Sequence, residues 1–144
     1  MAVLSEEQTM LRDMAREWTT NESPVTAFRK FRDLAPACGY DADAFKTMAE
    51  MGWAGIVIPE KFGGSDFGWL SLGLVLEETA KTLTASPLAA SALAASALVL
   101  GGSDGAKAAW LPKLASGEAV GTLAIDEGPR HNPAAIATTA TKAG

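Results

Sequence analysis

The side chains that could carry chemistry in this 144-residue chain are few, and they form no recognisable catalytic pattern. His131 is the only histidine, so a metal site built from several histidines is excluded. The carboxylate pairs Glu6-Glu7 and Glu77-Glu78 occupy adjacent helical positions. Such neighbours point about 100° apart and do not converge on one substrate atom. From the residues alone we predict no catalytic residue and no metal site.

Nucleophilic and nucleotide-binding motifs are missing as well. Cys38 is the single cysteine, which excludes an internal disulfide and fits the reducing cytoplasm. We interpret it as a small loop residue, because nothing in the sequence suggests a base beside it. No nucleophile elbow surrounds a serine, and neither a Walker loop nor a GxGxxG motif occurs. The acidic N-terminus lacks the basic start and apolar run of a signal peptide, so we expect a cytoplasmic protein.

Composition indicates a globular domain and argues against two classes of partner. Hydrophobic residues make up 48% of the chain and charged residues 20%, which is typical of a packed core. The net charge is −5 and no cluster of Lys and Arg occurs, so a nucleic-acid partner is not expected. The most apolar run, residues 88–100, is too short to cross a bilayer, so no membrane partner is expected either.

Apolar residues repeat at helical spacing up to residue 118, which predicts an all-α fold with a bundle of five or six helices. Ser5 and Gln8 have the capping-box pattern, and Asp41 or Asp43 can cap the third helix. The run 88–100 is apolar on all sides and is predicted to be the most buried helix. The predicted helices cover residues 5–20, 25–34, 41–51, 70–83, 88–100 and 103–114. The four tryptophans, Trp18, Trp53, Trp69 and Trp110, are predicted to be core anchors, each with a partner for its indole N–H.

The pattern changes after Gly117. Residues 119–125 alternate small and apolar side chains, which is typical of a strand, and the Thr/Ala-rich residues 133–144 can begin another. We therefore predict two parts, a helical bundle over 1–118 and a short β segment over 119–144. The run 56–58 is either a short buried strand or an extended loop.

Two motifs stand in the helical region, one near its middle and one at its end. The first is Gly52-Trp53-Ala54-Gly55-Ile56-Val57-Ile58-Pro59-Glu60-Lys61-Phe62-Gly63-Gly64, and the second is Lys107-x-x-Trp110-Leu111-Pro112-x-Leu114-Ala115-x-Gly117. In order and spacing they resemble the N-terminal helical domain of the acyl-CoA dehydrogenase family, flavoenzymes that desaturate acyl-CoA thioesters. The resemblance implies a helical domain over 1–118, the start of a central β domain over 119–144, and a later C-terminal helical domain. It also implies that residues 56–58 are an extended loop.

The resemblance implies further roles. The family's cofactor is FAD, and its catalytic base is a carboxylate of the C-terminal domain, so the isolated chain is expected to lack that base and to be inactive. The expected partners are acyl-CoA, the missing β and C-terminal helical domains, and further subunits in a homo- or hetero-oligomer. Residues matching the far end of the acyl pocket are Ala85, Ser86 and Ala89. Their small side chains predict room for a long or bulky acyl group.

The family's flavin-proximal motif, aromatic-x-x-Thr-Glu-Pro-x-x-Gly-Ser-Asp, is altered here. Leu123, Ile125 and Asp126 fall at its cofactor-facing positions, and Glu127 is retained. The family's threonine can donate a hydrogen bond toward the flavin, whereas an ionised Asp126 can only accept one. Two alternatives to an enzyme domain therefore stay open. One is a non-catalytic structural subunit of a mixed acyl-CoA dehydrogenase oligomer, and the other is a stand-alone helical interaction module.

Overall fold

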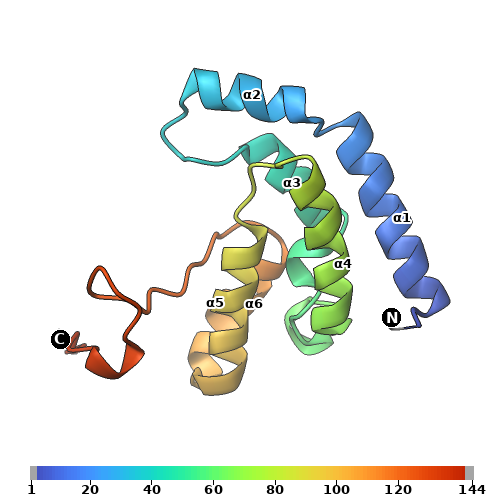
Figure 1. The fold of residues 1–144 in the computed structure, drawn as a ribbon. Coiled ribbons are helices and arrows are strands. Elements are labelled where there is room, and N and C mark those ends of the chain that lie inside the picture. The colour runs from blue at the N-terminus through green and yellow to red at the C-terminus, as the bar shows by residue number, and fades with distance from the viewer. Residues whose placement is uncertain (1–2, 142–144) are drawn as a thin grey trace.

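The computed structural model describes residues 3–141, which fold into six α-helices and three short 3-10 turns (Figure 1). The all-α prediction and the predicted number of helices are confirmed. The helices are α1 (Glu6–Asn21), α2 (Val25–Leu34), α3 (Ala42–Glu50), α4 (Gly68–Lys81), α5 (Leu88–Gly101) and α6 (Asp104–Ala115). The 3-10 turns are η1 (Trp53–Gly55), η2 (Glu60–Phe62) and η3 (Pro133–Ala135).

The helix starts follow the capping residues in the sequence. Ser5 Oγ accepts from the backbone N–H of Gln8 at 3.2 Å, and Gln8 Oε1 accepts from the N–H of Ser5 at 3.1 Å, which completes the predicted capping box. Of the two candidates for α3, Asp41 is the cap, because its carboxylate accepts from the N–H of Ala44 at 3.0 Å. Ser103 caps α6 in the same way.

The core lies between α1, α3, α4, α5 and η1. Its members are fully or almost fully buried apolar side chains, among them Leu11, Ala15, Phe45, Met48, Trp53, Ile56, Leu72, Val75, Leu88 and Ala92. A second cluster, Ile58, Ala95, Leu111, Leu114 and Ala115, joins α5 to α6. Helix α1 packs along α4, α5 packs along α6, η1 contacts α3, α5 and α6, and α2 lies across one end of the molecule (Figure 1).

The tryptophan prediction is half right. Trp53 is 1% exposed and meets the half-buried Trp18 edge to face, with ring centroids 5.5 Å apart. The prediction that each indole N–H has a hydrogen-bond partner is wrong for this pair, because neither buried N–H finds an acceptor among the described residues. The edge-to-face arrangement compensates in part, because it places the positive edge of one ring against the negative face of the other. Trp69 and Trp110 are about half exposed, so they are not core residues.

Residues 56–58 form a turn that continues η1, with helical backbone angles at Ile56, so neither the buried strand nor the extended loop implied by the resemblance is found. The N–H of Ile58 donates to the carbonyl of Gly55 at 3.0 Å, and the chain then reverses through η2. Gly63 has a φ of +85°, a conformation that favours glycine. A Cβ on Gly64 would collide with the carbonyl oxygen of Ile58. The paired glycines of the first motif are therefore required by backbone geometry.

Helix α5 corrects one prediction. It is not buried on all sides, because Leu93 is 49% exposed and Leu100 is 87% exposed. Its buried face carries Leu88, Ser91, Ala92 and Ala95, which pack against η1 and α6. No described element covers the opposite face. Composition predicts that an apolar surface is covered, but not by which element or on which side.

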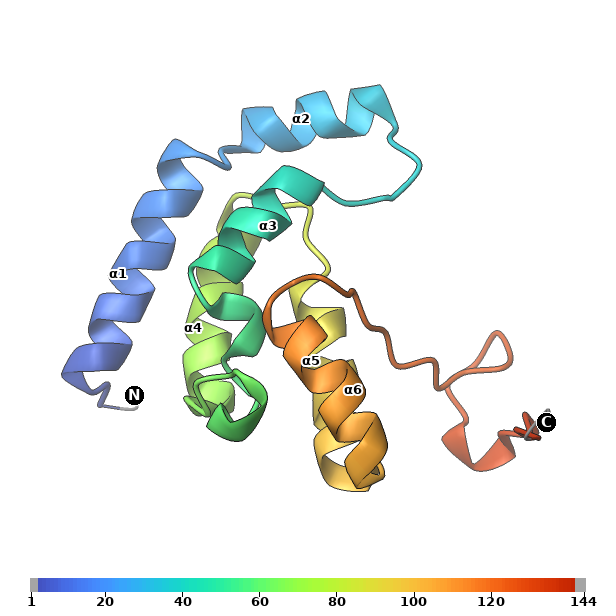
Figure 2. The same cartoon turned by 180° about the vertical axis from the view of Figure 1, so that it is seen from behind.

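The predicted β segment is also corrected. Residues 119–141 hold no strand; residues 119–123 lie against α5 and α6, and the chain beyond them runs away from the helices as extended chain, turns and η3 (Figure 2). A strand needs a hydrogen-bonded neighbour, and the described part of the chain supplies none. The predicted second strand extends over residues 142–144, which lie outside the described residues. Among the described helices, none has both the length and the hydropathy to span a membrane.

Candidate functional site

A groove of about 370 Å³ lies where α4 ends and α5 begins, and we call it the α4–α5 groove. Two of the three predicted substrate-pocket residues, Ser86 and Ala89, line it. Ala85 does not line it; its carbonyl accepts from the N–H of Asp41 at 2.9 Å and fixes the α4–α5 connection to the start of α3. The full lining is Leu76, Thr79, Ala80, Leu83, Thr84, Ser86, Leu88 and Ala89.

A Schellman turn ends α4 and shapes the mouth of this groove. The N–H of Leu83 donates to the carbonyl of Ala80 at 3.1 Å, and the N–H of Thr84 donates to the carbonyl of Thr79 at 3.0 Å. Leu83 occupies the left-handed position of the turn, with a φ of +57°, where glycine is usual. A side chain in this conformation costs about 1–2 kcal/mol. This backbone conformation places the apolar side chain of Leu83, which is 53% exposed, in the lining of the groove.

Hydroxyl groups line one side of the groove, and they bond to the protein. Thr84 Oγ1 lies 2.9 Å from Ser23 Oγ and 3.0 Å from Thr82 Oγ1. Thr82 Oγ1 donates to the carbonyl of Thr79 at 3.3 Å, and Thr79 Oγ1 donates to that of Leu76 at 3.0 Å. This network connects the turn to the end of α1, so it stabilises the shape of the groove.

Ser86 joins the groove to the core and to α5. Its Oγ donates to the sulfur of Met48 at 3.2 Å and accepts from the N–H of Leu88 at 3.1 Å. It therefore lies against the start of α5, where the helix begins at Leu88 and Pro87 occupies the cap position.

A buried ion cluster stabilises α4 behind the groove. The carboxylate of Glu78, with its side chain 3% exposed, accepts from Lys81 Nζ at 2.9 Å and from Arg16 on α1 at 3.0 Å. Burial by itself would raise the pKa of Glu78, but the hydrogen bonds from Lys81 and Arg16 outweigh it and lower the pKa below its ordinary value. Glu78 is thus an ionised residue whose carboxylate joins α4 to α1 through two cations.

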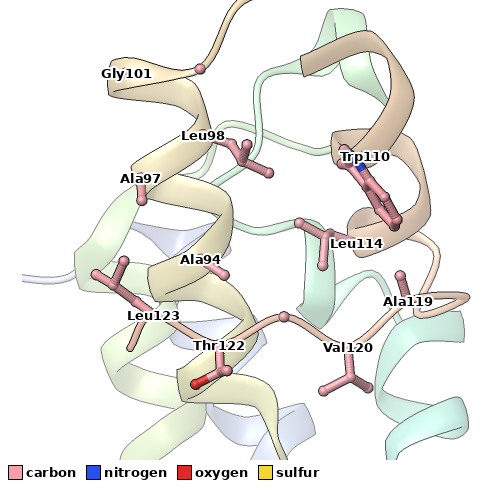
Figure 3. Close-up of a pocket in the computed structure, with 12 residues that line it drawn as sticks. Ala94, Ala97, Leu98, Gly101, Trp110, Leu114, Ala119, Val120, Thr122 and Leu123 are labelled. Atoms are coloured by element: carbon pink, nitrogen blue, oxygen red, sulfur yellow. The ribbon is translucent and has the colours of Figure 1, made fainter. Parts of the chain in front are cut away.

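A second, larger groove of about 600 Å³ lies between α5, α6 and residues 119–123, and we call it the α5–α6 groove (Figure 3). Among residues 3–141, no charged side chain lines it. The α5 side contributes Ala94, Ala97 and Leu98, and the α6 side contributes Trp110 and Leu114 (Figure 3). The N–H of Gly121 donates to Ser91 Oγ at 3.2 Å, which holds the extended segment against α5.

The predicted cofactor residues are separated by this arrangement. Leu123 lines the α5–α6 groove, while Ile125 and Asp126 do not. Asp126 instead accepts from His131 Nδ1 at 3.0 Å and from the N–H of Asn132 at 3.2 Å. Its carboxylate therefore closes an exposed turn over residues 126–132.

Glu127 has a structural role that sequence reasoning did not assign. Its carboxylate accepts from the N–H groups of Ala137 and Thr138, each at 2.8 Å, and from the hydroxyl of Thr138. The Thr138 hydroxyl and the two N–H groups lower the pKa of Glu127 below its ordinary value. The acceptor capacity of a carboxylate was visible in the sequence, but its partners ten and eleven residues away were not.

Sequence reasoning also missed Leu83, Thr79 and Thr84 as groove residues. The helical spacing of Leu76, Thr79 and Ala80 places them on one face of α4, which was the only signal available. Leucine carries no turn signal, so the left-handed turn at Leu83 could not be predicted.

Comparison with known proteins identifies this architecture. The family model described as "Acyl-CoA dehydrogenase, N-terminal domain" matches residues 5–118. The chain belongs to the acyl-CoA dehydrogenase family. It is 36% identical over 128 residues to (2S)-methylsuccinyl-CoA dehydrogenase of Cereibacter sphaeroides, an alignment that covers 86% of this chain and 22% of the relative.

Two solved structures of the family have the same fold. The Tcur3481-Tcur3483 steroid ACAD G363A variant superposes with a TM-score of 0.76 at 27% identity, over 85% of this chain and 33% of that one. A glutaryl-coenzyme A dehydrogenase in complex with glutaryl-CoA superposes with a TM-score of 0.72 at 29% identity, over 92% of this chain and 34% of that one. The chain thus spans between about a fifth and a third of the length of these three proteins.

FAD is the cofactor of the family, and the donor set at Asp126 does not fit it. At the position for which the family resemblance predicts a threonine, this chain has Asp126, whose carboxylate oxygens accept from His131 and Asn132. A carboxylate has no proton to offer a flavin, and its negative charge opposes that of a reduced flavin. Only Leu123 and Ile125, both apolar and partly exposed, suit an aromatic ring system.

Proposed function

We propose that this chain is the N-terminal part of an acyl-CoA dehydrogenase and that its α4–α5 groove forms one wall of the acyl pocket. The observation that carries the proposal is the position of Ser86 and Ala89. Both were assigned to the acyl pocket from the family's motifs, and both line one apolar groove. Apolar lining with a few fixed polar groups is the usual character of a small-molecule site.

In this proposal the chain binds and shields the acyl group and does not carry out the proton transfer. Its groove is lined by no acid, base or histidine. A wall of Leu76, Leu83 and Leu88 excludes water from the acyl chain and supplies binding energy of roughly 0.8 kcal/mol per buried methylene. The catalytic carboxylate and the rest of the site are supplied by other domains of the whole protein.

The proposed substrate is a long or bulky acyl-CoA. Ala89 and Ala80 present only methyl groups to the groove, so volume is left for the ligand. The similarity to a protein described as a steroid ACAD supports this proposal, because a steroid is a bulky group. We place the protein in the cytoplasm and expect it to act as a homo- or hetero-oligomer.

The experiment is an acyl-chain series on the intact protein produced from its gene. Ala89→Phe should lower kcat/KM for dodecanoyl-CoA by at least roughly tenfold, because the ring fills the groove, and should spare butanoyl-CoA. The matched control is Ala109→Phe on α6, which is exposed and lines neither groove. Equal activity of wild type and Ala89→Phe on dodecanoyl-CoA would refute the assignment.

A second function, a non-catalytic subunit of a mixed acyl-CoA dehydrogenase oligomer, is favoured by Asp126. Its carboxylate accepts hydrogen bonds within the 126–132 turn and has no proton to donate to a flavin. The distinguishing measurement is the FAD content of the purified protein, per subunit. One FAD per copy of this chain supports an enzyme with its own flavin site, whereas one FAD per pair of different subunits supports the structural role.

A further inference from the structure

We propose that the α4–α5 groove selects acyl groups whose far end is uncharged, and that it rejects acyl groups that end in a carboxylate. This inference rests on the proposed function and makes its substrate class specific. It follows from three features of the groove: the lining contains no cation, the hydroxyl protons already form hydrogen bonds within the protein, and the end of α4 points its negative pole at the groove.

The described part of this chain offers no cation to a carboxylate in the groove. Its eight lining residues include no Lys, Arg or His. The cations nearest along α4 and α1 are already paired: Lys81 Nζ lies 2.9 Å from Glu78 and 3.2 Å from Glu77, and Arg16 lies 3.0 Å from Glu78. A carboxylate entering the groove would lose its hydration without gaining a counter-ion, and such a burial is strongly unfavourable.

The hydroxyl protons are also taken. Three hydrogen bonds connect Ser23, Thr82, Thr84 and the Thr79 carbonyl, and only one arrangement of the protons makes all three. Thr82 donates to the carbonyl, so Thr84 must donate to Thr82, and Ser23 must donate to Thr84. Turning the Thr84 hydroxyl toward a ligand breaks one of these bonds.

The other two hydroxyls in the lining are engaged in the same way. Thr79 Oγ1 donates to the carbonyl of Leu76, and Ser86 Oγ donates to the sulfur of Met48. The threonines can therefore offer a ligand only their methyl groups, which suit a hydrocarbon chain, and their oxygen lone pairs, which repel an anion.

The backbone around the groove adds to this preference. The carboxyl end of α4 borders the groove, and it is the negative pole of that helix. The start of α5 is the opposite pole, and there Ser86 Oγ accepts from the N–H of Leu88, one of the donors of the first turn. Leu83, held in a conformation that favours glycine, adds an apolar side chain at the mouth.

Two of the relatives provide a chemical contrast. The proteins named for methylsuccinyl-CoA and glutaryl-CoA act on or bind thioesters whose far end is a carboxylate. The steroid ACAD is named for a largely hydrocarbon substrate. The groove of this chain suits the second chemistry.

The test compares octanoyl-CoA with suberoyl-CoA, which has the same eight carbons and a terminal carboxylate. With the intact protein produced from its gene, kcat/KM for octanoyl-CoA should exceed that for suberoyl-CoA by at least roughly 100-fold. Ala80→Arg places a cation in the groove from an exposed position of α4, and should shift this ratio at least roughly tenfold toward suberoyl-CoA. Leu34→Arg, 79% exposed on α2, is the matched control and should leave the ratio unchanged.

The outcomes separate the two proposals. Similar kcat/KM values for the two thioesters, or no change of ratio in Ala80→Arg, would overturn the inference while the proposed function stands. If neither thioester is oxidised, the proposed function fails. Methyl NMR then decides the inference: octanoate, and not suberate, should shift the resonances of Leu83 and Leu88, and equal shifts by both acids would overturn it.

Discussion

Removing the charge of Glu78 should weaken the packing of α1 on α4 and lower the free energy of unfolding. Glu78 is the buried acceptor that joins Arg16 on α1 to Lys81 on α4, with contacts of 3.0 and 2.9 Å. A hydrogen bond to a charged group contributes about 1.5–3 kcal/mol, and Glu78→Gln keeps only a neutral oxygen in that place. Both cations are about half exposed and can be rehydrated, which limits the loss. We therefore expect Glu78→Gln to lower the free energy of unfolding by about 2 kcal/mol at pH 7.

The assay is urea unfolding followed by circular dichroism, at pH 7 and at pH 4. The matched control is Glu77→Gln, one residue away, where the carboxylate is 65% exposed and pairs only with Lys81; it should cost less than about 0.5 kcal/mol. Because the pKa of Glu78 is lowered in the folded state, its stabilisation is present above the ordinary glutamate pKa and is lost as the pH falls through the folded value. The gap between wild type and Glu78→Gln should therefore shrink at low pH. A Glu78→Gln variant that loses no more stability than Glu77→Gln would refute the reasoning.

Three more predictions concern the glycine turn, the strained leucine and the extended tail. Gly64→Ala should lower the free energy of unfolding by about 3 kcal/mol, because the added Cβ would collide with the Ile58 carbonyl. The control is Gly73→Ala, which has open space on α4 and should leave the free energy of unfolding unchanged or raise it by up to about 1 kcal/mol. Thermal unfolding compares the two variants, and equal stabilities would contradict the argument. Leu83→Gly should raise stability by about 0.5–1 kcal/mol in the same assay, while weakening octanoyl-CoA turnover; a loss of stability contradicts the assigned strain. Limited proteolysis should cut residues 122–141 first, since all are exposed and hold no strand; cleavage within α4 before the tail contradicts this.

Much of the helical architecture could be predicted because its signals are local. Ser5 and Asp41 cap their helices through bonds to residues three positions away, so the chain itself carries that information. Gly52 and Gly63 adopt left-handed conformations at turns that their residue type predicts. The same locality explains why the helix count and most helix ends were right.

The features that could not be predicted depend on distant partners. Which side of α5 is covered depends on α6 and η1, and the apolar composition of α5 is the same all round. The strand expected over 119–125 needs a neighbouring strand, and its alternating pattern says nothing about whether one is present. Asp126 was visible as an altered residue of the flavin motif, but its bond to His131 was not.

The most direct test of the central claim, that the α4–α5 groove holds the acyl chain, is photo-crosslinking on the intact protein. The probe is a dodecanoyl-CoA analogue with a diazirine at the far end of its acyl chain, and labelled peptides are mapped by mass spectrometry. The account predicts labels on residues 76–89, with labelling suppressed by excess dodecanoyl-CoA. Labels confined to other parts of the protein, with none on residues 76–89, would contradict it.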